Sequence, residues 1–291
     1  MLEQLVPELV NGLALGALFA MIAIGLSLIM NLTGTINLAH GSFMTLAGYL
    51  AYTITSRGGN FWLALIVGAI ATMVVGIVVE RLLIARLYAR IPLYSLLLTF
   101  GLALIFEELF RLIWGLNGVP FSPPAALQGA AGIGGGLEVS SFRLVIAGAL
   151  IVVLGLLLLF LYRTPLGLRL RGAVLDPEMM QAFGTNTQLL YMTNFAVGIL
   201  LAAIAGVFTA GIYNLEPTMG NQVLMPAFIT VVIGGLGSIT GSVVGGLLIG
   251  VAISVTTLYV PAASEVVMYV LMALVLTVRP RGLFGVEGLF G

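Results

Sequence analysis

Long apolar stretches separated by short polar connectors fill almost the whole chain of 291 residues. A hydrocarbon core about 30 Å thick needs a helix of about 20 mostly apolar residues to cross it. Nine stretches meet or approach that length, at residues 8–30, 38–55, 61–82, 93–114, 142–162, 187–212, 223–236, 239–260 and 263–279. The pattern predicts an all-α fold, a polytopic transmembrane helical bundle of eight or nine membrane segments.

Two of these segments, 38–55 and 223–236, are short and follow or contain helix-breaking residues. We expect one or both to be broken or re-entrant helices, which is why the predicted count is eight or nine. Short interrupted segments in a transporter often mark the path of the solute. The sequence therefore directs attention to these two segments.

Charged residues make up 8% of the chain and hydrophobic residues 60%, and the formal net charge is zero. Soluble domains are about 25% charged, so most soluble functions are excluded, and the neutral balance gives no indication of a nucleic-acid partner. All 11 basic residues are arginine, whereas a Walker-type phosphate-binding loop requires a lysine. Cysteine is absent and His40 is the single histidine, which excludes thiolate and multi-histidine metal sites. We therefore predict no catalytic residue, no metal and no cofactor bound by this chain.

The arginines also predict an orientation, because arginine outside the membrane segments collects on the cytoplasmic side. They form three clusters, at 81–90, 163–171 and 279–281, and the remaining three are Arg57, Arg111 and Arg143. With the clusters inside, the N-terminus is periplasmic and the C-terminus cytoplasmic. Residues 1–7 carry no positive charge, so the first apolar stretch reads as a retained span rather than a secretory signal.

Polar and small residues interrupt the apolar pattern between Asn31 and Ser42. Backbone at membrane depth must be satisfied internally or line a wet cavity. Asn37, His40 and Ser42 bring hydrogen-bonding groups to this place and are candidate residues of the substrate pathway. The alternative is a polar cap that closes a helix break, with Asn37 or Thr35 as the N-cap.

A glycine-rich segment, Gly234–Gly250, repeats small residues every four positions. Small residues at this spacing let helix backbones approach closely, so tight packing is expected. Gly234, Gly235 and Ser238 also form a candidate helix break that presents backbone dipoles to substrate. The repeated positions are Gly237, Gly241, Gly245, Gly246 and Gly250, with Gly12 and Gly16 as a further pair.

The connector 163–186 contains a predicted helix of about two turns, in which Asp176 is a natural N-cap and Gly184 suits the C′ position. Its apolar residues have the i, i+3 and i, i+4 spacing of one helical face. A helix this short is unstable alone, so we expect it to dock into a groove of another protein; the alternative is a helix lying on the membrane surface. The candidate docking residues are Asp176, Pro177, Glu178, Met179, Met180, Phe183 and Gly184.

The longest connector outside the cytoplasm, 115–141, contains three prolines and a Gly132–Gly136 cluster. We expect ordered turns or a short surface helix there, as a docking face for a partner or as a plain connector. Glu107 and Arg111 have the spacing of an i, i+4 ion pair. No charged residue is expected in the middle of a span, which argues against coupling to an ion gradient.

Three ordered motifs and the tail carry a resemblance to a known family. They are Gly34–Gly41 (GTINLAHG), the loop Arg163–Asn186, Gly234–Gly246 (GGLGSITGSVVGG) and Arg279–Gly285. From its first span to its C-terminus the chain resembles the inner-membrane permease of branched-chain amino acid ABC importers, specifically the LivH-type subunit.

The resemblance implies one transmembrane permease domain over residues 1–291, in the bacterial inner membrane. It implies a second, LivM-type permease, two cytosolic ATPases that use ATP and magnesium, and a periplasmic binding protein. The helix Asp176–Gly184 corresponds to the coupling helix, within the cytoplasmic loop 163–186. The implied activity is transport of branched-chain or related amino acids by alternating access. Permeases of the same type for urea, amides or aromatic acids, and a passive channel for small solutes, are the alternatives.

The chain departs from the pattern of this family in one region. Pro226 stands where many relatives carry a lysine before the Ala-Phe pair, and Gly220–Met225 is also unusual. The departure places the pathway around residues 216–230 in question.

Overall fold

The computed structural model describes residues 2–88, 90–132 and 138–285. Within these ranges the chain forms eleven α-helices, three short 3-10 helices and one two-stranded hairpin, which confirms the predicted all-α bundle. The helices are α1 (Leu2–Thr33), α2 (His40–Thr55), α3 (Phe61–Leu82), α4 (Pro92–Trp114), α5 (Ser141–Arg163), α6 (Pro165–Leu175), α7 (Pro177–Ala182), α8 (Thr187–Ala210), α9 (Met219–Gly234), α10 (Ile239–Tyr259) and α11 (Val267–Val278). The shorter elements are η1 (Ile84–Leu87), η2 (Ala125–Leu127), η3 (Pro261–Ala263), β1 (Ala130–Gly132) and β2 (Glu138–Ser140).

Each of the nine predicted spans coincides with one helix, and three helix starts differ from the prediction by four residues or more. Helix α1 begins at Leu2 rather than at residue 8. Helix α9 begins at Met219 rather than at residue 223, and Pro226 lies inside it. Helix α11 begins only at Val267, because the 3-10 turn η3 and the residues after it occupy the expected start. By length and hydropathy α1, α3, α5, α8 and α10 can each cross a membrane, and α9 and α11 are shorter apolar helices.

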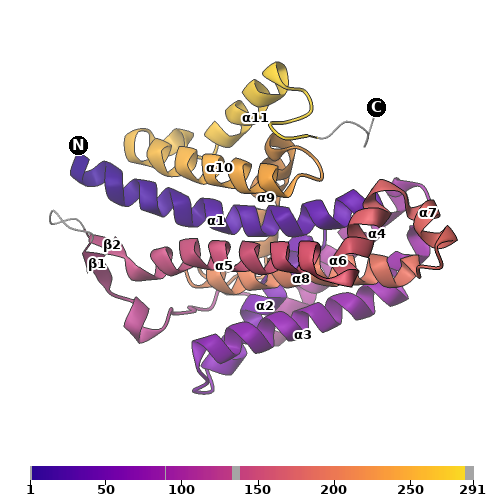
Figure 1. The fold of residues 1–291 in the computed structure, drawn as a ribbon. Helices are drawn as coiled ribbons and strands as arrows, with labels where there is room; N and C mark the ends of the chain where they lie inside the picture. The colour runs from indigo at the N-terminus through magenta and orange to yellow at the C-terminus, as the bar shows by residue number, and fades with distance from the viewer. Residues whose placement is uncertain (1, 89, 133–137, 286–291) are drawn as a thin grey trace.

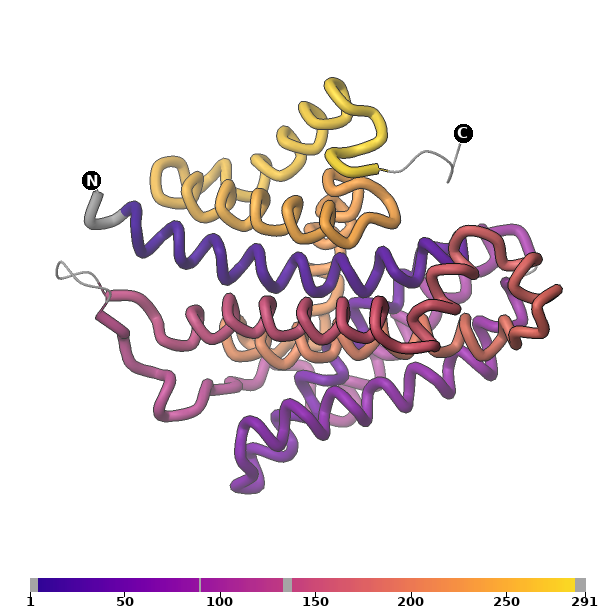
Figure 2. The backbone as a smooth tube through the Cα atoms, viewed as in Figure 1, coloured from indigo at the N-terminus to yellow at the C-terminus, as the bar shows by residue number. Residues whose placement is uncertain are grey.

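Helices α1 and α8 form the centre of the bundle (Figures 1 and 2). Helix α1 packs on α10, α8, α9 and α5, and α8 packs on α2 and α3 as well. Because neighbours surround them, both helices are mostly buried, whereas α3 and α5 leave most of their apolar surface exposed. Apolar surface on the outside is the arrangement expected of a bundle that faces lipid.

Glycine sets the close packing of α1 on α10. A Cβ at Gly16 would lie 2.7 Å from the carbonyl oxygen of Gly246, and one at Gly12 would lie 2.7 Å from the Cα of Val251. Real Cβ atoms do not approach other atoms so closely, so only glycine permits this contact. The predicted packing role of the two small-residue pairs is confirmed.

Five helices start with a side-chain cap, whereas α2, α4, α5, α9 and α11 have none. Side-chain oxygens of Asn60, Thr164, Asp176, Asn186 and Ser238 accept hydrogen bonds from the first turns of α3, α6, α7, α8 and α10. In helix α2 the N-cap is Ala39, and no side chain caps it. The Oδ1 atom of Asn37 instead accepts from the Ala39 N–H at 3.1 Å, within the turn before the helix. The expectation that Asn37 or Thr35 is the N-cap is therefore wrong, although Asn37 does close the break.

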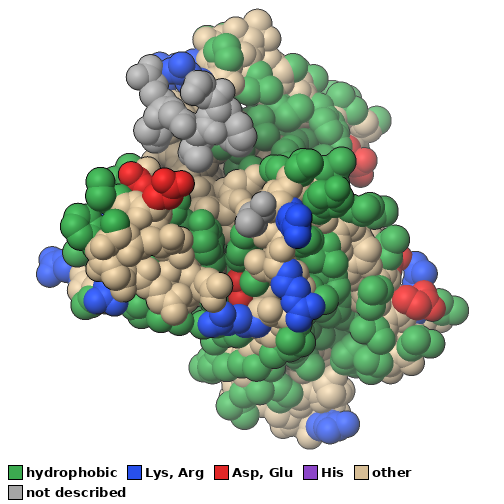
Figure 3. Space-filling model, turned by 90° about the vertical axis from the view of Figure 1, so that its right-hand side faces the viewer, with side chains coloured by type: hydrophobic (Ala, Val, Ile, Leu, Met, Phe, Trp, Pro, Cys, Tyr) green, Lys and Arg blue, Asp and Glu red, His purple; other side chains and the backbone are tan. Residues whose placement is uncertain are grey.

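The two ends of the bundle differ in charge. One end, the α7 end, carries η1, α6, α7 and the tail after α11, and therefore all three arginine clusters; Figure 3 looks onto it and shows the scattered arginines. The other end, the hairpin end, carries β1, β2 and η3, with Arg57 after α2, Arg111 near the end of α4 and Arg143 near the start of α5. The predicted separation of the arginines into two groups on opposite sides is confirmed.

The long connector at the hairpin end consists of turns and short pieces, as expected. It contains η2, the antiparallel pair β1–β2, and a bridge between Val119 and Leu215. The bridge ties this connector to the segment between α8 and α9. Residues 133–137, which make up most of the Gly132–Gly136 cluster, lie outside the described residues.

Candidate transport cavity

The two short helices, α2 and α9, meet at their first turns. Each has 16 residues, or roughly 24 Å at 1.5 Å per residue, which is less than the bilayer core of about 30 Å. A Cβ at Gly41 would lie 3.0 Å from the Cα of Gly220, and one at Gly220 would lie 2.8 Å from Oγ1 of Thr45. The two short helices that the sequence predicts thus contact each other at their N-terminal turns, where the glycines bring the two backbones together.

This junction lies inside the bundle rather than at either end. The Nε2–H group of His40, the first residue of α2, donates to the carbonyl oxygen of Ile22 at 3.2 Å. Ile22 belongs to the inner part of α1 and is fully buried. Helix starts leave unpaired N–H groups and a partial positive charge. Two such starts therefore lie deep within the apolar bundle.

The predicted pathway residues Asn37, His40 and Ser42 all lie at this junction and are buried in helix packing. Nδ2 of Asn37 and Nδ1 of His40 have no hydrogen-bond partner among the described residues. None of the three lines the cavity described below. The structure therefore places them behind the cavity wall, where they hold the start of α2.

Gly234, Gly235 and Ser238 lie far from that junction, at the opposite end of α9. They form the turn into α10, where Gly235 has a φ of 102° and Oγ of Ser238 accepts from the Gly241 N–H at 3.0 Å. The tail closes this turn, because the N–H groups of Leu283 and Phe284 donate to the carbonyls of Ile233 and Gly234 at 2.8 and 2.9 Å. The structure does not bring the two predicted parts of the pathway together.

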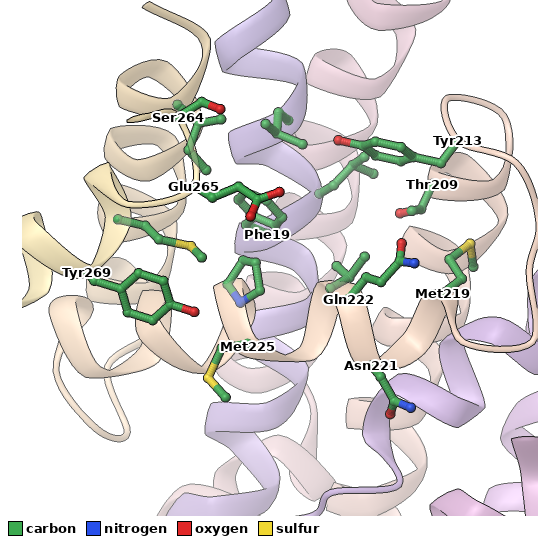
Figure 4. A pocket seen from close by; sticks show the side chains of 16 residues that line it. Phe19, Thr209, Tyr213, Met219, Asn221, Gln222, Met225, Ser264, Glu265 and Tyr269 are labelled. Atoms are coloured by element: carbon green, nitrogen blue, oxygen red, sulfur yellow. The ribbon is translucent and has the colours of Figure 1, made fainter. Parts of the chain in front are cut away.

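A cavity of about 630 Å³ lies between α1, α9, α10 and the start of α11 (Figure 4). Its lining combines apolar side chains with hydroxyl, amide and carboxylate groups. This mixture suits a solute that has one apolar part and several polar atoms. The lining residues include Phe19, Thr209, Tyr213, Met219, Gln222 and Glu265.

Sequence reasoning did not assign the cavity residues to the site. Glu265 reads only as the start of the last span. Thr209 reads as the end of the span 187–212, and Tyr213 directly follows that span. Two signals pointed near them: the shortness of the segment that became α9, and the departure of Gly220–Met225 from its relatives. That segment supplies Asn221, Gln222 and Met225 to the cavity wall.

A polar network ties the start of α9 to α4. Nδ2 of Asn221 donates to Oε2 of Glu107 at 3.0 Å. Arg111 pairs with Oε1 of Glu107 and, at 3.3 Å, with Glu108. The predicted Glu107–Arg111 pair is confirmed, and it holds a carboxylate in place for Asn221.

At the α7 end, the short helix α7 has the local geometry that the sequence predicts. Oδ1 of Asp176 accepts from the Met179 N–H at 2.8 Å, and Gly184 adopts a φ of 74° after the helix. The expected common face is only partly present, because Met180 packs against Gly172 and the interior of α6. Met179 and Phe183 are 52% and 76% exposed, and Glu178 is also exposed. Two large apolar side chains therefore remain uncovered there.

Groups of three or more metal-ligating side chains are absent from the described part of the chain. The geometry is that of a helical membrane bundle with two half-length helices, a polar junction between them and an amphipathic cavity beside it. Such an arrangement defines a membrane transport protein.

The chain belongs to the family "branched-chain amino acid transport system / permease component", whose model matches residues 8–276. It is therefore a multi-pass permease component of an ABC transporter and not itself an enzyme. No solved structure matches the chain.

Among curated proteins, the chain is 28% identical to the high-affinity branched-chain amino acid transport system permease protein LivH of Salmonella typhimurium strain LT2, over 96% of this chain and 94% of LivH. It is 30% identical to BraD of Pseudomonas aeruginosa, a permease protein with the same description, over 96% and 95%. It is 27% identical to the fructose import permease protein FruF of Bifidobacterium longum, over 94% of this chain and 77% of FruF.

Proposed function

We propose that this protein is the membrane-spanning permease of an ATP-driven importer of branched-chain or related amino acids. The observation that carries the proposal is the amphipathic cavity beside the junction of α2 and α9. Its apolar side chains suit an aliphatic side chain, and its polar groups suit a zwitterionic backbone. The relatives described as branched-chain amino acid permeases support the same substrate class.

The permease works with other subunits, because this chain has no nucleotide-binding loop of its own. A second, LivM-type permease completes the pathway, two cytosolic ATPases bind beneath the pair, and a periplasmic binding protein delivers the solute. The N-terminus is periplasmic and the C-terminus cytoplasmic, in the inner membrane of a bacterium. The arginines at the α7 end support this orientation.

We propose that transport is by alternating access, which the position of α7 supports. When ATP closes the ATPase dimer, the groove that holds the coupling helix Asp176–Gly184 moves, and α6 and the attached spans move with it. The exposed side chains of Met179 and Phe183 are suited to fill that groove. Asn37, His40 and Ser42 hold the start of α2 as it reorients, while Gly234, Gly235 and Ser238 hold the turn at the other end of α9.

Uptake in the native host tests this proposal. Cells that lack the chain are complemented with the wild-type gene, and uptake of radiolabelled leucine is measured with and without depletion of ATP. We expect uptake that depends on both the chain and ATP. Chain-dependent uptake of urea or an aromatic acid without leucine would contradict the substrate class, and leucine uptake that persists without ATP would indicate a channel.

A further inference from the structure

We propose that the carboxylate of Glu265 binds the ammonium group of the solute inside the cavity between α1, α9, α10 and α11. The inference rests on the function proposed above and assigns its specificity to one side chain. It makes a cationic amine, rather than a carboxylate, the group that this permease requires.

The charge of the cavity favours a cationic ligand. Glu265 is the one charged side chain among the described residues that line it, and the lining contains no arginine and no histidine. The chain as a whole contains no lysine. Glu265 is itself exposed, so its carboxylate is open to a cation that enters the cavity, and opposite charges attract there. A solute that carries only a carboxylate meets repulsion there.

The carboxylate of Glu265 has no partner within the described part of the chain. Glu265 makes no hydrogen bond and no ion pair with the described residues of the chain. It lies in the short connection between η3 and α11, and its carboxylate projects into the cavity beside Phe19 (Figure 4). The carboxylate of Glu107, which bonds the cavity residue Asn221, is in contrast already held by Arg111 and Asn221. Glu265 is therefore the acid that is available to a ligand.

The opposite wall supplies neutral partners for the rest of an amino acid. Thr209, Tyr213 and Gln222 come from the end of α8, the segment after it and the first turn of α9, and they face Glu265 across the cavity (Figure 4). The Thr209 hydroxyl already donates to the carbonyl of Ala205 at 2.8 Å, so it can only accept. The Tyr213 hydroxyl and the Gln222 amide can donate hydrogen bonds to a carboxylate without adding charge. Hydrogen bonds between two charged groups are stronger than those with a neutral partner. The bond of the solute's ammonium group to Glu265 therefore mainly sets the orientation of the solute in the cavity. Phe19 and Met219 leave apolar surface for the aliphatic side chain.

Two analogues of leucine distinguish the contribution of the ammonium group to binding from that of the carboxylate. Leucinamide keeps the ammonium group and lacks the carboxylate, and 4-methylpentanoate keeps the carboxylate and lacks the ammonium group. The importer complex is purified from its native membrane without the binding protein, so that selection by the binding protein does not enter. The unfolding temperature of the complex is measured as a function of the concentration of each analogue, and the affinity is taken from its rise.

We expect leucinamide to bind wild-type complex and 4-methylpentanoate not to bind at the same concentrations. Glu265→Gln should weaken the binding of leucinamide about tenfold or more, and a tenfold change in Kd corresponds to about 1.4 kcal/mol. Glu265→Asp should retain part of the affinity because it keeps the charge. Glu138→Gln removes an exposed carboxylate outside the cavity and should leave binding unchanged.

Equal binding of leucinamide by wild type and Glu265→Gln, or binding of 4-methylpentanoate in its place, would overturn the assignment. Loss of the second permease from the purified Glu265→Gln complex would also overturn it, because the residue would then belong to a subunit interface. Leucine uptake in cells separates this failure from that of the proposed function. A wild-type chain without leucine uptake refutes the function and the inference with it, whereas normal uptake by Glu265→Gln refutes the inference alone.

Discussion

The backbone of Gly41, in the first turn of α2, rests directly against the backbone of Gly220, in the first turn of α9. Thr45 and Gly220 are in similar contact, so neither glycine has room for a side chain. The contact joins two half-length helices, and the two glycines are 179 residues apart along the chain (220 − 41). It thereby fixes one wall of the cavity.

Replacement of either glycine should therefore separate the two helices. Gly41→Ala should lower the free energy of unfolding by about 1–3 kcal/mol, the usual cost of overpacking, although alanine is the better helix former. Leucine uptake should fall with it. Gly148→Ala in α5 is the matched control, because a Cβ there meets nothing within 4 Å. If the two variants unfold at the same temperature, the Gly41–Gly220 contact does not hold the junction.

The bond between Asn221 and Glu107 predicts a charge effect at the same junction. Asn221→Asp places two carboxylates where Nδ2 and Oε2 now lie 3.0 Å apart, and like charges this close repel by at least about 1 kcal/mol. Leucine uptake by this variant should fall severalfold. Adding Glu107→Gln should restore it, since the new amide can donate to the aspartate. A double variant as impaired as the single one would show that the bond is unimportant for transport.

The exposed side chains of α7 predict the route of coupling. Phe183→Asp and Met179→Asp should each leave the permease folded, because both side chains are largely exposed, and should separate ATP hydrolysis from uptake, because a charge would be forced into an apolar groove. Leu116→Asp, an exposed leucine after α4 at the hairpin end, is the control and should couple normally. Wild-type uptake in both α7 variants would remove this helix from the coupling mechanism.

The tail after α11 predicts a stability effect at the α9–α10 turn. Leu283 and Phe284 donate to two carbonyls at the end of α9 that otherwise lack partners, and each such bond contributes about 0.5–1.5 kcal/mol. A chain that stops after Val278 should unfold at a lower temperature than one that stops after Gly285. Equal unfolding temperatures would mean that the tail does not stabilise the turn.

Much of the architecture could be predicted because its signals are local. Apolar length located all nine spans, and Asp176 and Gly184 marked the ends of α7. Small-residue spacing indicated close helix packing, which the structure shows between Gly16 and Gly246. Each of these follows from a few adjacent residues and the periodicity of a helix.

The cavity could not be predicted because it is assembled from distant segments. Phe19, Gln222 and Glu265 belong to α1, α9 and the start of α11, and no short-range pattern relates them. The boundary of α9 was missed for a similar reason, since tertiary packing of Gly220 on Gly41 favours a helix start that the sequence alone does not mark. His40 drew attention as the sole histidine, yet packing places it behind the cavity wall.

We infer that this chain transports as one subunit of an ATP-driven assembly. The most direct measurement is gentle detergent purification of the tagged chain from its native membrane, with mass spectrometry of the proteins that co-purify. We expect a second permease and two ATPase subunits in stoichiometric amounts. A chain that purifies alone as a stable homo-oligomer would contradict it and would require the coupling role of α7 to be withdrawn.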